Sequence, residues 1–471
     1  MHAITVFSAM GGNGFVPADA RCRLVAISVL WCFIFLLPVS AFAAQALNQL
    51  QTLDDSSGIL PVSLGKPTGC FFTNAYGFNS GSYPEELVVA GATYCGGDYQ
   101  LPFKWSGGHW IPLELPEGNV VGGQATGVDD NPEAPPTITY QLYESGGGNY
   151  AYVLSEGALP IKLELLPDMI GSEMTRLTAE GGHVIGDNWN GDWDSGYNYR
   201  AVRWSRDGES WSAPEDLAPG RAIAASEDGS IVIGNGEVWE WFRDAQPWIW
   251  TSAPGGGELT WLESWAAVYD ITHDGSMIVG SRPQPCSNPD KCDFLPAPVY
   301  WVIEEGAWVM HDLQALDDVD SIATSVAMVD GSAIIVGYGY TNNGQGGIRR
   351  AVVWLPAPDG SYGAPLRLES LGANFESMAS PVDINRNGVV LGWSELEPWG
   401  ATNDVIWSLF ERLPFQINGW ITDAWYNPVT SGQGFSIHVW EKTQTVFLAW
   451  FTYETERPDG GVSAELGEPG H

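Results

Sequence analysis

The sequence predicts an all-β protein: a seven-bladed β-propeller of four-stranded repeats, each about 50 residues long, followed by a small C-terminal β module. Two observations carry this prediction. A polar turn followed by a short apolar run recurs, as in "SEDGSIVIG" from Ser226, "THDGSMIVG" from Thr272 and "NRNGVVLG" from Asn385. Glycine and tryptophan also recur at a nearly constant spacing, and seven such units fill residues 58–412.

One full unit begins at Arg221 and contains four short strand-like stretches. The apolar stretches "RAIAAS" and "IVIG" flank the turn "EDGS", and "QPWIWTS" and "ELTWLES" follow a polar loop. Asp-Gly and Asn-Gly pairs favour the positive φ that tight hairpins need. We therefore expect the same glycine to turn the first strand into the second in four units, at Gly229, Gly275, Gly331 and Gly388.

The period of the repeat comes from a glycine that closes the second strand and a tryptophan in the third. The glycines are 48, 46, 57 and 55 residues apart, at Gly186, Gly234, Gly280, Gly337 and Gly392. The tryptophans are Trp105, Trp204, Trp250, Trp301, Trp354 and Trp407. The first two are 99 residues apart, which is two steps, so the missing member is expected at Val153 or Leu154.

A four-stranded unit of this length is typical of a propeller blade, because neighbouring blades bury the two faces that one sheet leaves open. A β-solenoid or a pair of β-sandwiches is the rival architecture. Solenoid rungs are usually shorter, and sandwiches do not repeat so regularly.

The best-preserved copies read "GGHVIG…YRAVRW", "EDGSIVIG…PWIW", "HDGSMIVG…PVYW" and "GSAIIVG…RRAVVW". They resemble the bacterial extracellular repeat of the HAF family, and the resemblance covers about three quarters of the chain. It implies a secreted or surface repeat protein, usually without an assigned activity. The first two units depart most from the pattern.

The N-terminal segment resembles an export signal, so residues 1–43 are predicted to be a signal peptide and 44–57 a linker. Arg21 and Arg23 precede a mainly apolar run of 14 residues, Leu24 to Leu37, and Ala41-Phe42-Ala43 matches the small-x-small cleavage pattern. An uncleaved membrane anchor is the competing interpretation. After cleavage we expect no membrane span, and a periplasmic or extracellular location.

Export makes the cysteines interpretable, because disulfides form in oxidising compartments. Cys70, Cys95, Cys286 and Cys292 remain after removal of the leader. Of the three pairings, Cys70–Cys95 with Cys286–Cys292 is preferred, since each pair then lies within one repeat. A metal site is the weaker alternative.

The formal net charge is −37, from 57 acidic and 20 basic residues. Such a surface repels phosphate backbones and anionic lipid, so nucleic-acid binding and membrane adsorption are disfavoured. It also offers many carboxylates to divalent cations.

The sharpest candidate for a cation site is the segment "DNWNGDWDSG". Its oxygen-bearing side chains converge on one Ca²⁺ if the segment is a loop that curls. The EF-hand template fails, and a solvated loop between the second and third strands is the plain alternative. The candidate metal ligands are Asp187, Asn188, Asn190, Asp192 and Asp194.

Residues 413–471 follow a different pattern, in which "GFSIHVW" and "TVFLAWFTY" are predicted strands and "EKTQ" the turn between them. The motifs "WYNP", "GQGF" and "AWFTY" resemble a small module found near the ends of secreted proteobacterial proteins. Its aromatic residues form either a binding face or the core of a small domain.

No HExxH zinc motif or GxSxG nucleophile elbow occurs in the sequence. The sequence therefore favours an exported, monomeric module without catalysis, which binds or gives structure to an extracellular or envelope ligand, a carbohydrate or a protein.

The alternative is a propeller enzyme, a polysaccharide lyase or glycoside hydrolase, with its site at the axis where the blades meet. That alternative needs acids, histidines or tyrosines that converge on the axis, and His183 and His273 lie near first hairpins. A smooth acidic funnel would instead favour binding.

Overall fold

The computed structural model describes residues 59–410 except 82–85, 97–99, 131–134, 156, 179, 193–195, 237–245, 255, 264, 286–293, 317–319, 343–346, 373–376 and 398–400, and also 423–426, 434–440 and 445–451. The chain divides into two compact units, Met1–Phe410 and Glu411–His471. The regular elements of the described residues are all strands, and none of these residues forms a helix long and apolar enough to cross a membrane.

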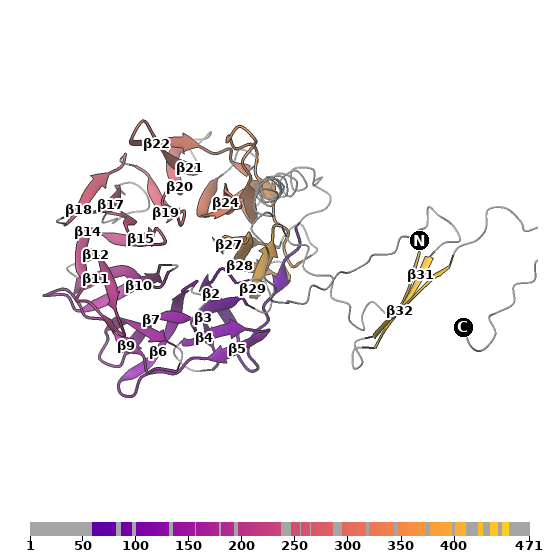
Figure 1. Cartoon of the computed structure of the whole chain (residues 1–471), viewed down its shortest axis with the longest axis horizontal. Coiled ribbons are helices and arrows are strands. Elements are labelled where there is room, and N and C mark those ends of the chain that lie inside the picture. The colour runs from indigo at the N-terminus through magenta and orange to yellow at the C-terminus, as the bar shows by residue number, and fades with distance from the viewer. Residues whose placement is uncertain are drawn as a thin grey trace, which may run out of the picture. The chain divides into compact units, whose positions relative to one another are not determined.

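Seven antiparallel sheets stand around one axis, so the first unit is a seven-bladed β-propeller, as the sequence predicts (Figure 1). Blades 1 to 3 contain β2 (Phe72–Phe78), β3 (Val88–Tyr94), β4 (Leu101–Ser106) and β5 (His109–Pro112); β6 (Val120–Val128), β7 (Thr137–Glu144), β8 (Asn149–Ser155) and β9 (Ile161–Lys162); and β10 (Gly171–Leu177), β11 (His183–Asp192), β12 (Gly196–Asp207), β13 (Ser210–Trp211) and β14 (Glu215–Pro219).

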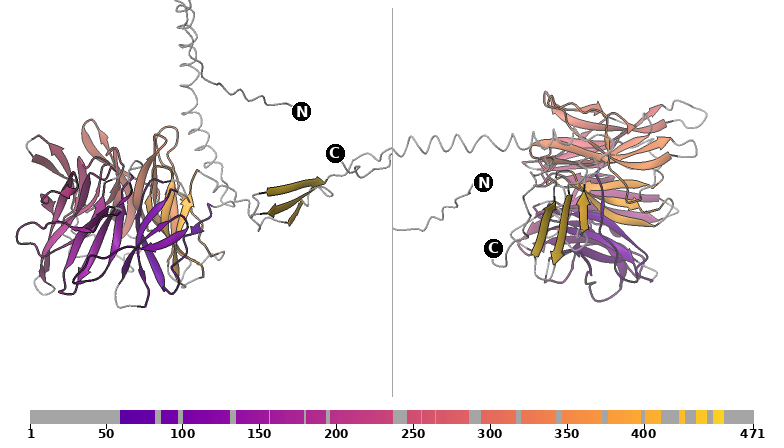
Figure 2. Two further views of the ribbon diagram at one scale, coloured as in Figure 1. Left: turned by 60° about the horizontal axis from the view of Figure 1, so that its bottom comes forward. Right: turned by 90° about the vertical axis from the view of Figure 1, so that its right-hand side faces the viewer.

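Blades 4 to 7 repeat the arrangement, and the strands run roughly between the two faces of the ring (Figure 2). They contain β15 (Arg221–Ala225), β16 (Ile231–Asn235), β17 (Pro247–Ala253) and β18 (Gly256–Trp261); β19 (Ala267–Ile271), β20 (Met277–Pro285), β21 (Phe294–Glu304) and β22 (Ala307–Asp312); β23 (Ser321–Val329), β24 (Ser332–Asn342), β25 (Gly347–Trp354) and β26 (Leu366–Arg367); and β27 (Ala379–Ile384), β28 (Val389–Glu395), β29 (Thr402–Ser408) and β1 (Val62–Ser63).

The N-terminal strand closes the ring. The last repeat supplies only three strands, and β1 completes its sheet by pairing Val62 with Ile406 and Ser63 with Val405. Leu64 extends the pairing, because its amide donates to the carbonyl of Asp404 over 2.9 Å. Residues 62–64 therefore belong to the seventh blade, since an unpaired edge strand would otherwise remain there.

The repeated glycine of the second strand lies opposite a β-bulge in the inner strand. In blade 5 the pairing shifts between Val268 and Asp270, and Gly280 faces Val268. A Cβ on Gly280 would lie 2.0 Å from the carbonyl oxygen of Ala267. Gly337 has the same relation to Ile322, also at 2.0 Å. The glycine recurs because only a residue without a side chain fits beside the bulge.

The hairpin glycines adopt the conformation that the sequence predicts. Their φ angles are positive, at 67° for Gly229, 70° for Gly275, 79° for Gly331 and 70° for Gly388. These hairpins join the inner strand of a blade to its second strand, so they all lie on one face of the ring.

The recurrent tryptophans join neighbouring blades. Trp204, Trp354 and Trp407 are fully buried, and each indole N–H donates over 2.8 Å to a carbonyl that follows the outer strand of the preceding blade. The acceptors are Glu164, Gln314 and Glu369.

The core is divided among the interfaces between blades. Seven apolar clusters occur in the described residues, one for each pair of neighbouring blades. In blade 2, Val153 and Leu154 lie in the third strand, as expected for the missing tryptophan, and Val153 packs against Trp204.

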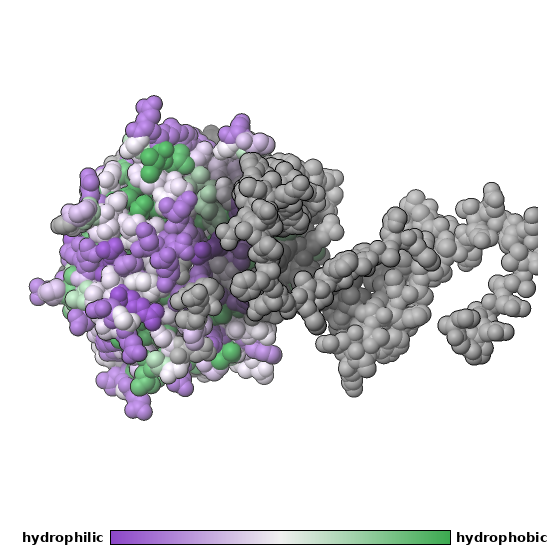
Figure 3. Space-filling model, in the orientation of Figure 1, coloured by the Kyte–Doolittle hydropathy of each residue, from purple (hydrophilic) through white to green (hydrophobic). Residues whose placement is uncertain are grey.

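The predicted disulfide Cys70–Cys95 is present, and it joins the segments before β2 and after β3 in blade 1. Cys286 and Cys292 lie outside the described residues. On the face of the ring that Figure 3 shows, hydrophilic residues predominate and apolar residues form small separate patches.

The C-terminal unit contains one antiparallel sheet in the order β30 (Asp423–Tyr426), β31 (Gly434–Trp440) and β32 (Thr445–Phe451). The last two strands lie where the sequence predicts them.

Candidate functional site

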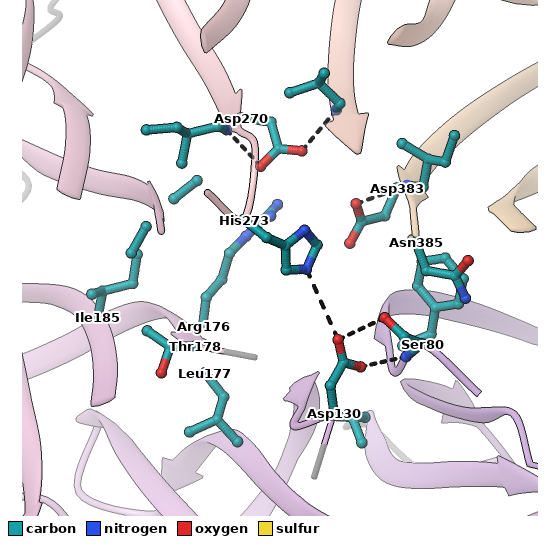
Figure 4. Close-up of a pocket in the computed structure, with 17 residues that line it drawn as sticks. Ser80, Asp130, Arg176, Leu177, Thr178, Ile185, Asp270, His273, Asp383 and Asn385 are labelled. Carbon is teal, nitrogen blue, oxygen red and sulfur yellow. Dashed lines mark hydrogen bonds and ion pairs between the residues drawn. The ribbon is translucent and has the colours of Figure 1, made fainter. Parts of the chain in front are cut away.

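The ends of the seven inner strands line one pocket on the axis of the propeller, at the face that carries the first hairpins. Its volume is about 100 Å³. Polar atoms form the larger part of its walls, and the charged members are Asp130, Arg176, Asp270, His273 and Asp383; Phe78, Val128, Leu177 and Ile271 are among the apolar members. Figure 4 shows Arg176, Asp270, His273 and Asp383 directed at one space. A pocket this small admits a few water molecules or one small group.

One position of the repeat supplies the deepest polar groups. In each blade this is the residue at which strand pairing resumes after the bulge of the inner strand. We call the seven residues at this position the axial layer. The seven members are Gly77, Gly127, Arg176, Ala224, Asp270, Ser325 and Asp383. The bulge turns this residue toward the axis, and three consecutive blades, 5 to 7, place polar side chains there.

Asp270, Ser325 and Asp383 form a continuous hydrogen-bonded chain. The Ser325 Oγ lies 2.5 Å from Asp270 Oδ2 and 2.7 Å from Asp383 Oδ1. Backbone amides bind both carboxyl groups: Val326 N donates to Asp270 Oδ2 over 2.9 Å, and Ile384 N donates to Asp383 Oδ1 over 2.8 Å. These contacts fix both carboxyl groups relative to the sheet.

The pKa of Asp270 is raised to about 6, mainly by burial and next by the nearby carboxylate of Asp383. Arg176 and the hydrogen bonds from Ser325 and Val326 act in the opposite direction, because they favour the charged form. Asp270 is only 9% exposed, so desolvation outweighs these contacts.

A second polar layer lies three residues further along the chain, in the hairpins. We call Ser80, Asp130, Glu227, His273 and Arg386 the hairpin layer. Arg386 Nη2 donates to Asp130 Oδ2 over 3.0 Å and to Glu227 Oε1 over 2.8 Å. Ser80 Oγ donates to Asp130 Oδ2 over 2.6 Å, and His273 Nε2 lies 3.9 Å from the same oxygen. This layer is nearer to solvent, since the Arg386 side chain is 39% exposed.

Of the two histidines considered from sequence, only His273 lines this pocket. His183 lies at the start of β11, where its Nδ1 is 3.0 Å from Ser205 Oγ and its ring packs against Gly229 of the next blade. Burial lowers the pKa of His183. It therefore belongs to the interface between blades 3 and 4.

The candidate calcium segment is a strand where the sequence analysis placed a loop, since β11 runs through Asp187, Asn188, Asn190 and Asp192. Successive strand residues point to opposite faces, so Asp187 and Asn188 diverge. Asp187 Oδ1 accepts from Ala222 N over 2.8 Å, and Asn188 Oδ1 accepts from Leu166 N over 2.7 Å. Both residues are fully buried.

The other candidate ligands are Asn190, Asp192 and Asp194. Asn190 donates its amide to the carbonyl of Asp168 over 3.2 Å, and Asp194 lies outside the described residues. Within the described part of the chain, no group of three or more His, Cys, Asp or Glu side chains is arranged to hold a metal ion. A calcium site in this segment stays a prediction.

The sequence analysis did not identify the axial layer, although a signal for it exists. Arg176, Asp270 and Asp383 each precede the hairpin glycine of their blade by five residues, at Gly181, Gly275 and Gly388. Aligning the repeats on these glycines brings the charged residues into one column. With 57 acidic residues in the chain, only that alignment separates these aspartates from the rest.

No protein-family model and no curated protein matches the chain, so the resemblance to the HAF repeat and to the C-terminal module stays a prediction. Among solved structures, the chain is similar to the β-propeller domain of a trilobed protease from Pyrococcus furiosus, at 11% identity over 74% of this chain and 100% of that one, with a TM-score of 0.46.

It is also similar to an acylaminoacyl peptidase from Pyrococcus horikoshii, at 11% identity over 81% of this chain and 58% of that one, with a TM-score of 0.45. An oligogalacturonate lyase from Vibrio parahaemolyticus is 12% identical over 73% of this chain and 92% of that one, with a TM-score of 0.46. These similarities are too distant to carry an argument about function.

Proposed function

We propose that the protein is an exported, non-catalytic binding propeller that receives one part of an extracellular or envelope ligand, a carbohydrate or a protein, in its axial pocket. The observation that carries this proposal is the pocket itself, a space of about 100 Å³ to which the inner strands of all seven blades contribute. The leader-like N-terminus and the Cys70–Cys95 disulfide support export, because disulfides persist in oxidising compartments.

The arrangement of the acids favours binding over hydrolysis. Glycoside hydrolases keep two carboxyl groups apart and leave the space between them for the bond to be cleaved. Here the hydroxyl of Ser325 fills that space, at 2.5 Å from Asp270 and 2.7 Å from Asp383. The pocket is also smaller than the roughly 300–1,000 Å³ of sites that enclose whole small molecules.

The alternative, a propeller lyase or hydrolase, keeps one observation in its favour. Three aspartates, one arginine and His273 do converge at the axis, which is the arrangement that an axial enzyme site needs. The formation of products distinguishes this alternative from the proposal.

The test uses the chain starting at Ala44, incubated with a panel of polysaccharides, peptidoglycan and proteins in the presence and absence of calcium. Retention on each polymer and new chain ends are measured, the latter by mass spectrometry. Two variants obstruct the pocket from different blades, Ala225→Phe and Ser80→Phe. Trp261→Ala, at a 41% exposed site on β18, is the control.

Retention without products, lost in both pocket variants and kept in the control, supports the proposal. Retention that both pocket variants keep contradicts it, as does the appearance of new chain ends that depend on His273 or the axial aspartates.

A further inference from the structure

The hydrogen-bonded chain at the axis contains too few hydrogens for two ionised carboxylates. A serine hydroxyl has one hydrogen and can donate it to one oxygen. Ser325 Oγ nevertheless lies within hydrogen-bonding distance of an oxygen of Asp270 and an oxygen of Asp383, at 2.5 and 2.7 Å. One of the two carboxyl groups must therefore carry a proton and donate it to Ser325, or two lone pairs would face each other.

The charges around this pair also call for one proton on it. Arg176 is the cation of the axial layer, and it acts on Asp270 directly. Two ionised aspartates against one arginine leave one negative charge in excess, in a setting where an uncompensated charge is costly. A single shared proton removes that excess in the empty pocket.

The remaining charged groups that face the pair belong to the hairpin layer. Asp130 and Glu227 both pair with Arg386, which leaves one excess negative charge there, and His273 adds a positive charge only when it is protonated. The way from solvent to the pair is therefore not blocked by an excess of positive charge.

The walls of the pocket indicate the shape of a ligand. Apolar side chains, Phe78, Val128, Leu177 and Ile271, lie beside the acids and other polar groups of the lining. The pocket has about 100 Å³, less than the roughly 150 Å³ of an engineered cavity that holds a benzene ring, so only the end of a ligand enters it. A methylene stem that ends in a cation presents its carbons to the apolar side chains and its charge to the acids.

From these observations we infer that the axial pocket takes a linear primary ammonium group, such as a lysine side chain or a free alkyl diamine, and that this group replaces the proton shared by Asp270 and Asp383. The inference rests on the proposed function, since it names the part of the ligand that enters the pocket. The ammonium enters the pocket with its positive charge, and the shared proton leaves to solvent.

Competition between one proton and one ammonium predicts how binding depends on pH. Below the pKa of Asp270, affinity should fall about tenfold for each pH unit, and about one proton should be released per ligand bound. Above that pKa the empty pocket has already lost the proton, so affinity should level off and proton release should vanish. The ligand stays charged throughout, because an alkyl ammonium has a pKa near 10.

The test is isothermal titration calorimetry on the chain starting at Ala44, at pH 5.0, 6.0 and 7.5, in two buffers of different ionisation enthalpy. The probes are 1,5-diaminopentane, N-acetyl-lysine methylamide and N-acetyl-norleucine methylamide, the last with a similar stem but no charge. Binding of the lysine derivative alone points to a peptide ligand. Binding of the diamine alone points to a free amine, and binding of both supports the shared chemistry.

Asp383→Asn is the informative variant, because an asparagine oxygen can keep the contacts to Ile384 N and Ser325 while the charge is lost. We expect its affinity for the ammonium probes to fall more than tenfold and to lose its dependence on pH. Asp312→Asn removes the same charge at a 63% exposed site on β22 and should bind like the parent chain. Thermal unfolding checks that both variants fold.

Binding without proton release at pH 5.0, equal binding of the norleucine derivative, or unchanged binding by Asp383→Asn would each overturn the inference. If the pocket variants lose polymer retention while no amine binds, the proposed function survives and this inference fails. If amines bind with proton release but no polymer is retained, the inference about the pocket survives and the proposed function fails.

Discussion

The pair formed by Asp270 and Asp383 should make the stability of the propeller depend on pH, and Asp383→Asn tests this without any ligand. The pKa of Asp270 is about 6 in the folded chain and 3.8 for an unperturbed aspartate. Between these values the folded chain binds more protons than the unfolded chain. The free energy of unfolding therefore decreases as the pH rises through this range.

The magnitude follows from the size of the shift. A difference of about two pH units corresponds to about 3 kcal/mol, at about 1.4 kcal/mol per unit. Burial is the larger cause and Asp383 the second, so removing the charge at residue 383 should recover less than half. We expect Asp383→Asn to be roughly 1 kcal/mol more stable than the parent at pH 7.5 and nearly equal to it at pH 4.5.

Urea unfolding at a series of pH values from 4.5 to 8.0 measures this difference. Asp312→Asn is the matched control, because it also lowers the net negative charge by one but lies on the exposed outer strand β22. The other buried acids act equally in all three proteins. If Asp383→Asn and Asp312→Asn show the same pH profile, the assignment of a shared proton to the axial pair is wrong.

Three further predictions concern the framework. Trp354→Ala should cost about 3–5 kcal/mol, because it empties a fully buried site and leaves a carbonyl of the preceding blade without its donor; urea unfolding measures the loss. The Cys70–Cys95 disulfide joins residues 25 apart in sequence, and reducing it should cost about 3 kcal/mol of stability. Thermal unfolding should therefore show a lower melting temperature with reductant, and the variant Cys70→Ser should show the same lowered melting temperature without reductant. Gly280→Ala should destabilise by about 1–3 kcal/mol in chemical denaturation, since its Cβ would lie 2.0 Å from a backbone oxygen, whereas Gly146→Ala has open space and should be nearly neutral.

The repeat was predictable from sequence because it is local. Gly229 and Gly275 follow from turn chemistry within a few residues, and the tryptophan period follows from packing that each blade repeats. The number of blades then follows from the length of the repeated region. These features need no knowledge of which residues meet across the ring.

The axial layer was not predicted, since its members meet only when the ring closes. Asp270 and Ser325 are 55 positions apart in the sequence, and Ser325 and Asp383 are 58 apart. The bulge that directs them inward is a property of backbone pairing, which a single strand does not reveal. The loop expected around the candidate calcium ligands was not found for a related reason: pairing with β12 extends β11 to 10 residues, and the strand includes Asp187, Asn188, Asn190 and Asp192.

The pairing of Val62 with Ile406 has a consequence for the order of assembly. Residue 62 is synthesised early, and residue 406 follows 344 residues later. Strand β1 therefore stays unpaired while the other blades are synthesised. Loop-closure entropy rises only slowly with length, so the delay is kinetic more than thermodynamic. The pairing of β1 with β29, which joins the two ends of the ring, is thus expected to form last in folding. It is also expected to open first when a force pulls on the N-terminus.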